Sequence, residues 1–92
     1  MNLVNLTPSA LTSGAGDTTF LAHELATKQS GIVQVEGIND ETIQIQGRLE
    51  GSMSWVTLVT FTADNAQSIM LFPEMRINMS SGTGSVTARI GA

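Results

Sequence analysis

The sequence contains no cysteine and only one histidine, His23. Without thiols the chain forms no disulfide, holds no zinc–thiolate centre and performs no cysteine catalysis. A single histidine leaves carboxylates to complete any metal site, so no metal and no cofactor are expected. The 92 residues suffice for one domain, and a chain this short buries only roughly 60–65% of the surface that its unfolded form exposes. Self-association or docking on a partner is the expected source of further stability.

Charge is also scarce. Only 13% of the residues are charged, against about 25% in ordinary soluble domains. The net charge of −4 and the pI near 4.5 argue against nucleic acid as a partner, because phosphate backbones require a basic surface. No apolar run approaches the ~20 residues that span a membrane. The N-terminal "MNLVNLTPSAL" lacks the basic region and apolar stretch of a signal peptide, so we expect a protein made in a cytoplasm.

What is present is an alternation of apolar and polar residues from Gly31 onward, interrupted by turn sequences every 8–12 residues. The segments "GIVQVEG", "TIQIQGRLEG", "WVTLVTFTA", "SIMLF", "MRINM" and "SVTARI" each read as a strand. No helical segment is long enough to connect parallel strands. The predicted fold class is therefore all-β: a small antiparallel β-sandwich, jelly-roll-like, with an extended N-terminal arm.

The domain prediction assigns Met1–Asp17 to the arm and Thr18–Ala92 to a single β-sandwich domain. "NLVNL" predicts a short strand in the arm, and turn-forming residues follow it. An apolar arm packs along the body, passes to a neighbouring subunit or frays, and we take Leu3, Val4 and Leu6 as interface candidates. After the arm the pattern predicts a strand or extended segment, with one helical turn around Ala22–Lys28.

The alternation also predicts two inner faces. The expected core anchors are Trp55, Ile43, Ile45 and Ile77, each aliphatic residue contributing roughly 1.5–3 kcal/mol if fully buried. Phe20 and Phe61 are expected to cap the ends. The first face is expected to hold Val33, Val35, Ile43, Ile45, Leu49, Trp55 and Leu58, and the second Ile69, Leu71, Met75, Ile77, Met79, Val86 and Ile90.

No arrangement of residues predicts catalysis. A Ser-His-Asp set built from His23 and a distant aspartate would rest on composition alone. The adjacent Asp40 and Glu41 are expected to diverge in a solvated turn. The segment "SSGTGS" joins two strands and opens no helix, so it is not expected to bind phosphate.

Arg76 lies between two inward-facing residues and must point outward. It is a further interface candidate, suited to pairing with a carboxylate in its own subunit or across an interface, or to an ordinary surface ion pair.

The order of these segments resembles that of small virion proteins of tailed bacteriophages. The resemblance covers Gly31 to Ala92 and departs at "EGSMS", where an acidic–glycine turn is expected before the tryptophan. It implies a β-sandwich or jelly-roll-like module that serves as a head decoration (cement) protein, head fibre or tail component, and it implies no catalytic residue. The matching positions are Gln46, Gly47, Trp55, Pro73, Arg76, Ile77, Gly82, Gly84, Val86 and Thr87.

Two functions follow as expectations. The first is a capsid decoration or cement subunit that binds and stabilises the head shell. Its partners would be the major capsid protein or another virion protein and further copies of itself, most simply as a homotrimer in the virion. The arm would reach a neighbour by adding a strand to a sheet edge. The alternative is a glycan- or host-binding module of a fibre or tail component, in which Trp55 stacks on a sugar.

Overall fold

A computed structural model describes residues 3–6, 14–21, 28–82 and 84–92. Within these residues the chain is all-β with antiparallel strands and contains no helix, which confirms the predicted fold class at this level. Most of the long strands start and end close to the predicted segments, because Gly, Asn, Asp, Ser or Pro residues that favour turns lie near their ends. The bounds predicted for "SIMLF" are wrong: that strand runs from Asn65 to Met70 and leaves out Leu71 and Phe72. The strands are β1 (Leu3–Asn5), β2 (Gly14–Ala15), β3 (Thr19–Phe20), β4 (Ser30–Glu36), β5 (Thr42–Arg48), β6 (Val56–Phe61), β7 (Asn65–Met70), β8 (Glu74–Ser81) and β9 (Thr87–Gly91).

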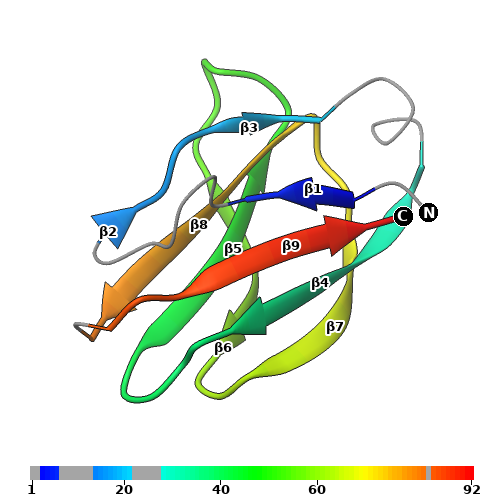
Figure 1. Ribbon diagram of the computed structural model, residues 1–92. Helices are drawn as coiled ribbons and strands as arrows, with labels where there is room; N and C mark the ends of the chain where they lie inside the picture. The colour runs from blue at the N-terminus through cyan, green and yellow to red at the C-terminus, as the bar shows by residue number, and fades with distance from the viewer. Residues whose placement is uncertain (1–2, 7–13, 22–27, 83) are drawn as a thin grey trace.

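The strands form two sheets (Figure 1). The first sheet has the order β1-β9-β4-β7. In the second sheet β8 pairs with β5 and β5 with β6, while β2 and β3 both pair along the outer edge of β8. Most connections therefore pass from one sheet to the other, and the β5–β6 hairpin stays within the second sheet.

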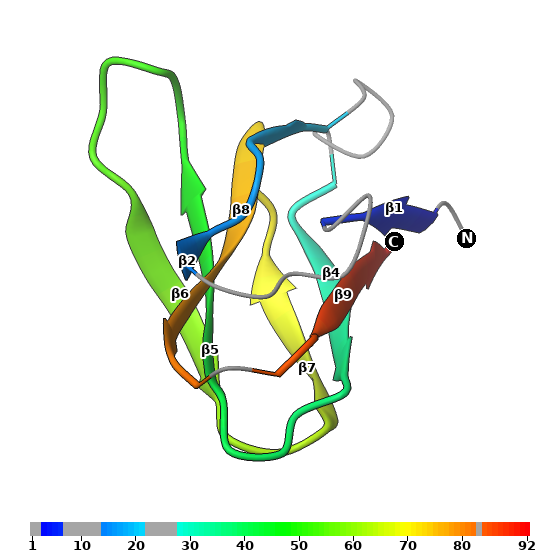
Figure 2. The same ribbon diagram turned by 60° about the vertical axis from the view of Figure 1, so that its left-hand side comes forward.

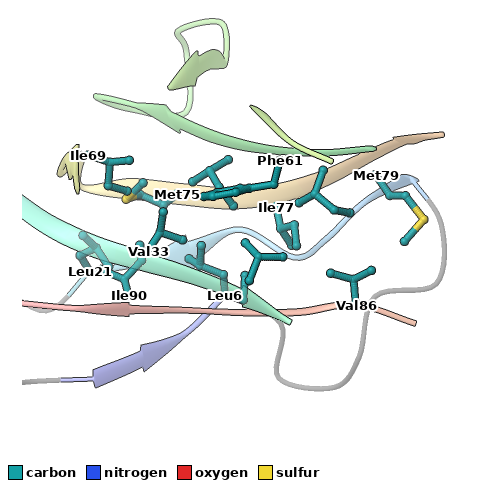
Figure 3. Close-up of a cluster of buried hydrophobic side chains, with 14 residues drawn as sticks. Leu6, Leu21, Val33, Phe61, Ile69, Met75, Ile77, Met79, Val86 and Ile90 are labelled. Atoms are coloured by element: carbon teal, nitrogen blue, oxygen red, sulfur yellow. The ribbon is translucent and has the colours of Figure 1, made fainter. Parts of the chain in front are cut away.

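The two sheets lie face to face, and their inward side chains form one core (Figures 2 and 3). Ile43, Ile45 and Ile77 are fully buried, as predicted. Their neighbours along the chain point outward because side chains of a strand alternate between faces. The core consists of Leu6, Leu21, Val33, Val35, Ile43, Ile45, Phe61, Ile69, Met75, Ile77, Met79, Val86, Ala88 and Ile90.

Three core predictions are wrong. Leu49 is 59% exposed because β5 ends at Arg48, one residue before the alternation would turn Leu49 inward. The inner position at this end is Gly47, and a Cβ there would lie 2.8 Å from the ring of Phe72, which fills the space instead. Phe20 is 72% exposed at the outer edge of β8. Trp55 is only partly buried and lies outside the core cluster.

The described part of the N-terminal segment packs along its own chain. Leu3, Val4 and Asn5 pair with Gly91, Ile90 and Arg89 of β9. The N–H of Leu6 donates a 2.9 Å hydrogen bond to the carbonyl of Ala88, and the Leu6 side chain is fully buried. Leu6 is thus a core residue, and the expectation that it serves an interface is wrong. Residues 22–27, which include His23 and most of the predicted helical turn, lie outside the described residues.

Candidate functional site on the outer face of the second sheet

Polar side chains follow β5 and β8 on the outer face of the second sheet. The strands pair Gln44 with Asn78, Gln46 with Arg76 and Arg48 with Glu74 in consecutive outward positions. Since Ile43, Ile45, Met75 and Ile77 fill the inner face, the strand period places these six side chains together on the other side. We call them the polar ladder: Gln44, Gln46, Arg48, Glu74, Arg76 and Asn78.

Hydrogen bonds connect the two sides of the polar ladder. Nε of Arg48 donates to Oε1 of Glu74 at 2.9 Å, Nε of Arg76 to Oε1 of Gln46 at 2.7 Å, and Nδ2 of Asn78 to Oε1 of Gln44 at 2.9 Å. Each bond joins the two members of one cross-strand pair, the unit from which sheets gain side-chain stabilisation.

Gln46 extends the polar ladder toward β6. Its Nε2 donates to Oγ1 of Thr57 at 3.2 Å and lies 3.4 Å from Oε1 of Gln44. The Gln46 side chain is buried, and both ends of its amide are hydrogen-bonded, so its orientation is set by the protein. A ligand would meet a surface that is already ordered, which lowers the entropy that binding costs.

Trp55 immediately precedes β6 and lies against two arginines of the polar ladder. The guanidinium carbon of Arg48 is 4.2 Å and that of Arg76 is 4.5 Å from the centroid of the indole ring. Contacts of this kind contribute about 0.5–1 kcal/mol each at exposed sites. Two guanidinium groups thus lie over Trp55, which is partly buried without belonging to the core cluster.

Only one of the two guanidinium groups is paired with a carboxylate. Among the described residues the only salt bridge is that of Arg48 with Glu74, and Arg76 is held by an amide. Desolvation and then the positive charge of Arg48 lower the pKa of Arg76 from its ordinary value. The predicted pairing of Arg76 with a carboxylate is therefore not found within the described part of this subunit. The polar ladder keeps a positive charge on a chain whose net charge is −4.

A second polar cluster lies at the opposite end of β5 and is centred on Glu41. Glu41 is 2% exposed, and its carboxylate accepts hydrogen bonds from the N–H of Asn39 at 2.8 Å and of Gly84 at 3.0 Å. It thereby ties the β4–β5 turn to the β8–β9 connection. Gly82 has a φ of +109°, and a Cβ there would lie 2.6 Å from the Cα of Glu41. The expectation of a solvated Glu41 is wrong, and close packing on Glu41 accounts for the glycines of "SSGTGS".

The same contacts shift the titration of Glu41. Its pKa falls from 4.5 to about 2, first because of the hydrogen bond with the side chain of Asp40 and next because of the N–H of Asn39. The N–H groups of Gly84 and Asp40 act in the same direction, and burial opposes them. A buried carboxylate that accepts hydrogen bonds from Asn39 and Gly84 is a structural clamp. Sequence reasoning missed it, since nothing in "NDETI" separates a buried clamp from an exposed turn.

The structure also separates the interface candidates. Leu3 is 70% exposed on the first sheet, whereas Arg76 belongs to the outer face of the second. Val4 is partly buried against the core. The candidates therefore do not form one site: Leu3 is exposed, Val4 and Arg76 are partly buried, and Leu6 is fully buried.

The polar ladder presents amide and guanidinium groups beside an aromatic ring, a set of groups suited to binding a polar ligand. Nowhere in the described residues do three His, Cys, Asp or Glu side chains come together to hold a metal ion. Within the same residues no helix is long and apolar enough to cross a membrane.

No family model matches the sequence, and neither a curated protein nor a solved structure matches it. The function is therefore inferred from the fold and from the surfaces described above.

Proposed function

We propose that the chain is a structural protein of a tailed-bacteriophage particle, a capsid decoration or cement subunit that binds and stabilises the head shell. Strand order is the observation that carries the proposal. With β2 and β3 counted as two halves of one strand, the sheets read β1-β9-β4-β7 and β2/β3-β8-β5-β6. This order supports the assignment of a jelly-roll β-sandwich, an architecture used by viral capsid proteins and by lectins.

The residues that carry the resemblance to phage virion proteins support the proposal through their contacts. Gln46, Trp55 and Arg76 are distant in sequence but contact one another on one face. Gly82 and Gly84 both pack against Glu41. The resemblance thus rests on residues that hold the β5–β6 hairpin and the β8–β9 connection in place, as expected of a module whose role is a stable shape.

As such a subunit the protein would work without catalysis or cofactor. Its partners would be the major capsid protein or another virion protein and further copies of itself, with a trimer as the simplest arrangement. It would be assembled into the virion in the host cytoplasm.

The test is co-sedimentation of the purified protein with assembled heads of the phage that encodes it. We expect saturable binding at a fixed number of copies per head and a higher temperature for genome release from decorated heads. Heads that neither bind the protein nor gain thermal stability would contradict the proposal. A shell of unrelated geometry serves as the control for nonspecific adhesion.

A glycan-binding function is the second candidate, and the ordered polar ladder beside Trp55 favours it. Against it, Arg48 and Arg76 already contact the indole ring, so stacking on a sugar would require the arginines to move. Trp55 is the single tryptophan and the chain has no tyrosine, so its fluorescence reports on this site alone. Emission that changes saturably with a saccharide would favour this function, and emission unchanged across neutral and acidic saccharides would exclude a role for Trp55.

A further inference from the structure

Arg76 keeps unused hydrogen-bond donors in the middle of the polar ladder. Its Nε donates to Gln46, and none of the described residues accepts a hydrogen bond from its two Nη groups. Arg76 is only partly buried, and no buried side-chain nitrogen or oxygen of the described residues lacks a partner. The Nη groups are therefore open to solvent, and together they form a planar pair of donors that matches the two oxygens of a carboxylate.

The charge of Arg76 also has no carboxylate partner among the described residues. The one carboxylate of the polar ladder, Glu74, is paired with Arg48. Arg76 is thus a partly desolvated cation beside a second cation, and both effects lower its pKa. A negative charge at the open side of Arg76 would favour the charged guanidinium again. The complementary ligand for this side is an anion.

Two amides of the polar ladder keep unused groups next to Arg76. Nδ2 of Asn78 donates to Oε1 of Gln44, which leaves Nε2 of Gln44 and Oδ1 of Asn78 without a partner among the described residues. Both side chains are partly exposed, so these two groups are accessible. Hydroxyl groups satisfy an amide NH2 and an amide oxygen alike, because a hydroxyl both donates and accepts.

The spacing of these groups suits one small ligand. Arg76 and Asn78 are two residues apart on the same face of β8, about 7 Å along the strand, and Gln44 is the cross-strand partner of Asn78. A sugar ring that carries a carboxylate presents a negative charge at one position and hydroxyls at the others. It therefore offers both kinds of group to this part of the polar ladder.

The surface beside the polar ladder is polar as well. On β6 Thr57 pairs with Gln46 and Thr60 with Gln44, and both threonines are exposed. The exposed Phe20 lies at the outer edge of β8, by the opposite end of the polar ladder from Gln44. Protein–protein interfaces are built around an apolar centre, and the described residues of β5, β6 and β8 expose no aliphatic side chain on this face. A ligand rich in hydroxyl groups fits this surface better than a protein partner does.

We propose that the polar ladder binds an acidic saccharide, with the carboxylate of the sugar on the Nη groups of Arg76 and its hydroxyls on Gln44 and Asn78. The sugar needs no stacking on Trp55, so both guanidinium groups can stay against the indole ring. The inference rests on the second candidate function, for which it names the ligand class, and not on the capsid role. A chain that binds only neutral saccharides would keep the glycan-binding function and overturn this inference.

Isothermal titration calorimetry of the full chain with acidic oligosaccharides tests the proposal. The oligosaccharides carry glucuronate, galacturonate, mannuronate or N-acetylneuraminate, and the methyl ester of each is the uncharged match. At least one acid should bind with a dissociation constant below about 1 mM. Its ester should bind on the order of 10- to 100-fold more weakly, because the ester loses hydrogen bonds between charged groups.

Arg76→Gln should weaken binding of that acid by on the order of 10- to 100-fold. Arg89→Gln is the matched control, because it removes the same charge from a residue that bonds to Asn5 on the other sheet, and it should bind as the wild type does. Circular dichroism checks that both variants are folded, and the comparison of acid with ester needs no variant.

Three results would overturn the proposal: no acid binds, the esters bind as tightly as the acids, or the two arginine variants lose equal affinity. An oligoglutamate peptide that binds more tightly than every acidic saccharide would assign the polar ladder to a protein partner and would overturn it too.

Discussion

Gln46 and Arg76 face each other across β5 and β8, and Nε of Arg76 donates a 2.7 Å hydrogen bond to the side-chain oxygen of Gln46. An amide acceptor orients a guanidinium group without neutralising it. The outer face of the second sheet therefore keeps an ordered positive charge next to Trp55, a combination that the four basic residues of this chain would not suggest.

Replacing Arg76 should uncover Trp55. In Arg76→Met the indole loses one of its two guanidinium contacts, so acrylamide should quench its fluorescence more strongly and the emission should move to longer wavelength. The loss of stability should stay within about 1 kcal/mol, the value of one cation–π contact at an exposed site. Arg89→Met is the control, because Arg89 bonds to Asn5 on the other sheet. Equal quenching in the two variants would contradict the contact.

Acid should weaken the protein through Glu41. Its folded-state pKa of about 2 lies below the ordinary value of 4.5, so its ionised form contributes stability above pH 4.5, and that contribution is lost as the pH falls toward 2. The urea midpoint of the wild type should drop across this interval. Glu41→Gln should be less stable than the wild type at pH 7, and the difference should shrink toward pH 2. A constant difference over this range would show that the carboxylate charge is not the cause.

The core boundary near the end of β5 is testable with two substitutions. Ile45→Ala removes a fully buried side chain and should cost about 2–5 kcal/mol of unfolding free energy. Leu49→Ala changes a side chain that is 59% exposed and should change the free energy by about 0.5 kcal/mol or less. Urea denaturation followed by circular dichroism measures both. Similar losses of unfolding free energy in the two variants would show that Leu49 is a core residue.

Gly82 should tolerate no side chain. Gly82→Ala puts a Cβ at a φ of +109° and 2.6 Å from the Cα of Glu41, so the connection must shift and the cost should be about 1–3 kcal/mol or more. Gly51→Ala is the control, because the nearest atom to its Cβ would be the flexible end of Arg48 at 3.9 Å. Thermal unfolding of the two variants separates them, and a Gly82→Ala protein as stable as Gly51→Ala would contradict the close approach.

Leu6 should matter for folding and Leu3 should not. Leu6→Ala empties a fully buried position and should cost about 2–5 kcal/mol, while Leu3→Ala, at a side chain 70% exposed, should cost about 0.5 kcal/mol or less. Both variants are compared with the wild type at the same protein concentration. If Leu6→Ala is as stable as the wild type, Leu6 does not contribute to the core, and the N-terminal segment acts as an arm that can detach.

The sequence predicted the strands well where alternation and turn residues agreed. In β4, β5 and β8 the alternation has a period of two, and the inward positions Ile43, Ile45 and Ile77 follow from it. In β6 and β7 the alternation is not regular. The prediction failed at strand ends. Leu49 follows the last residue of β5 and Trp55 precedes the first residue of β6. The local sequence pattern does not show which distant side chain fills the core beside such positions. Phe72 over Gly47 is such a contact between separate segments.

The candidate site was predictable only in part. That Gln44, Gln46 and Arg48 point outward follows from the alternation alone. Their pairing with Asn78, Arg76 and Glu74 depends on the register between β5 and β8. That register is set by the packing of residues that are far apart in sequence.

The last strand, β9, lies between β1 and β4 in the middle of the first sheet. The first sheet therefore has no centre until β9 inserts, and the pairing of Leu3 with Gly91 joins residues that are far apart in sequence. Pairing over such a distance slows folding. Until β9 is in place β4 has one unpaired edge, and an unpaired strand edge exposes a β domain to aggregation.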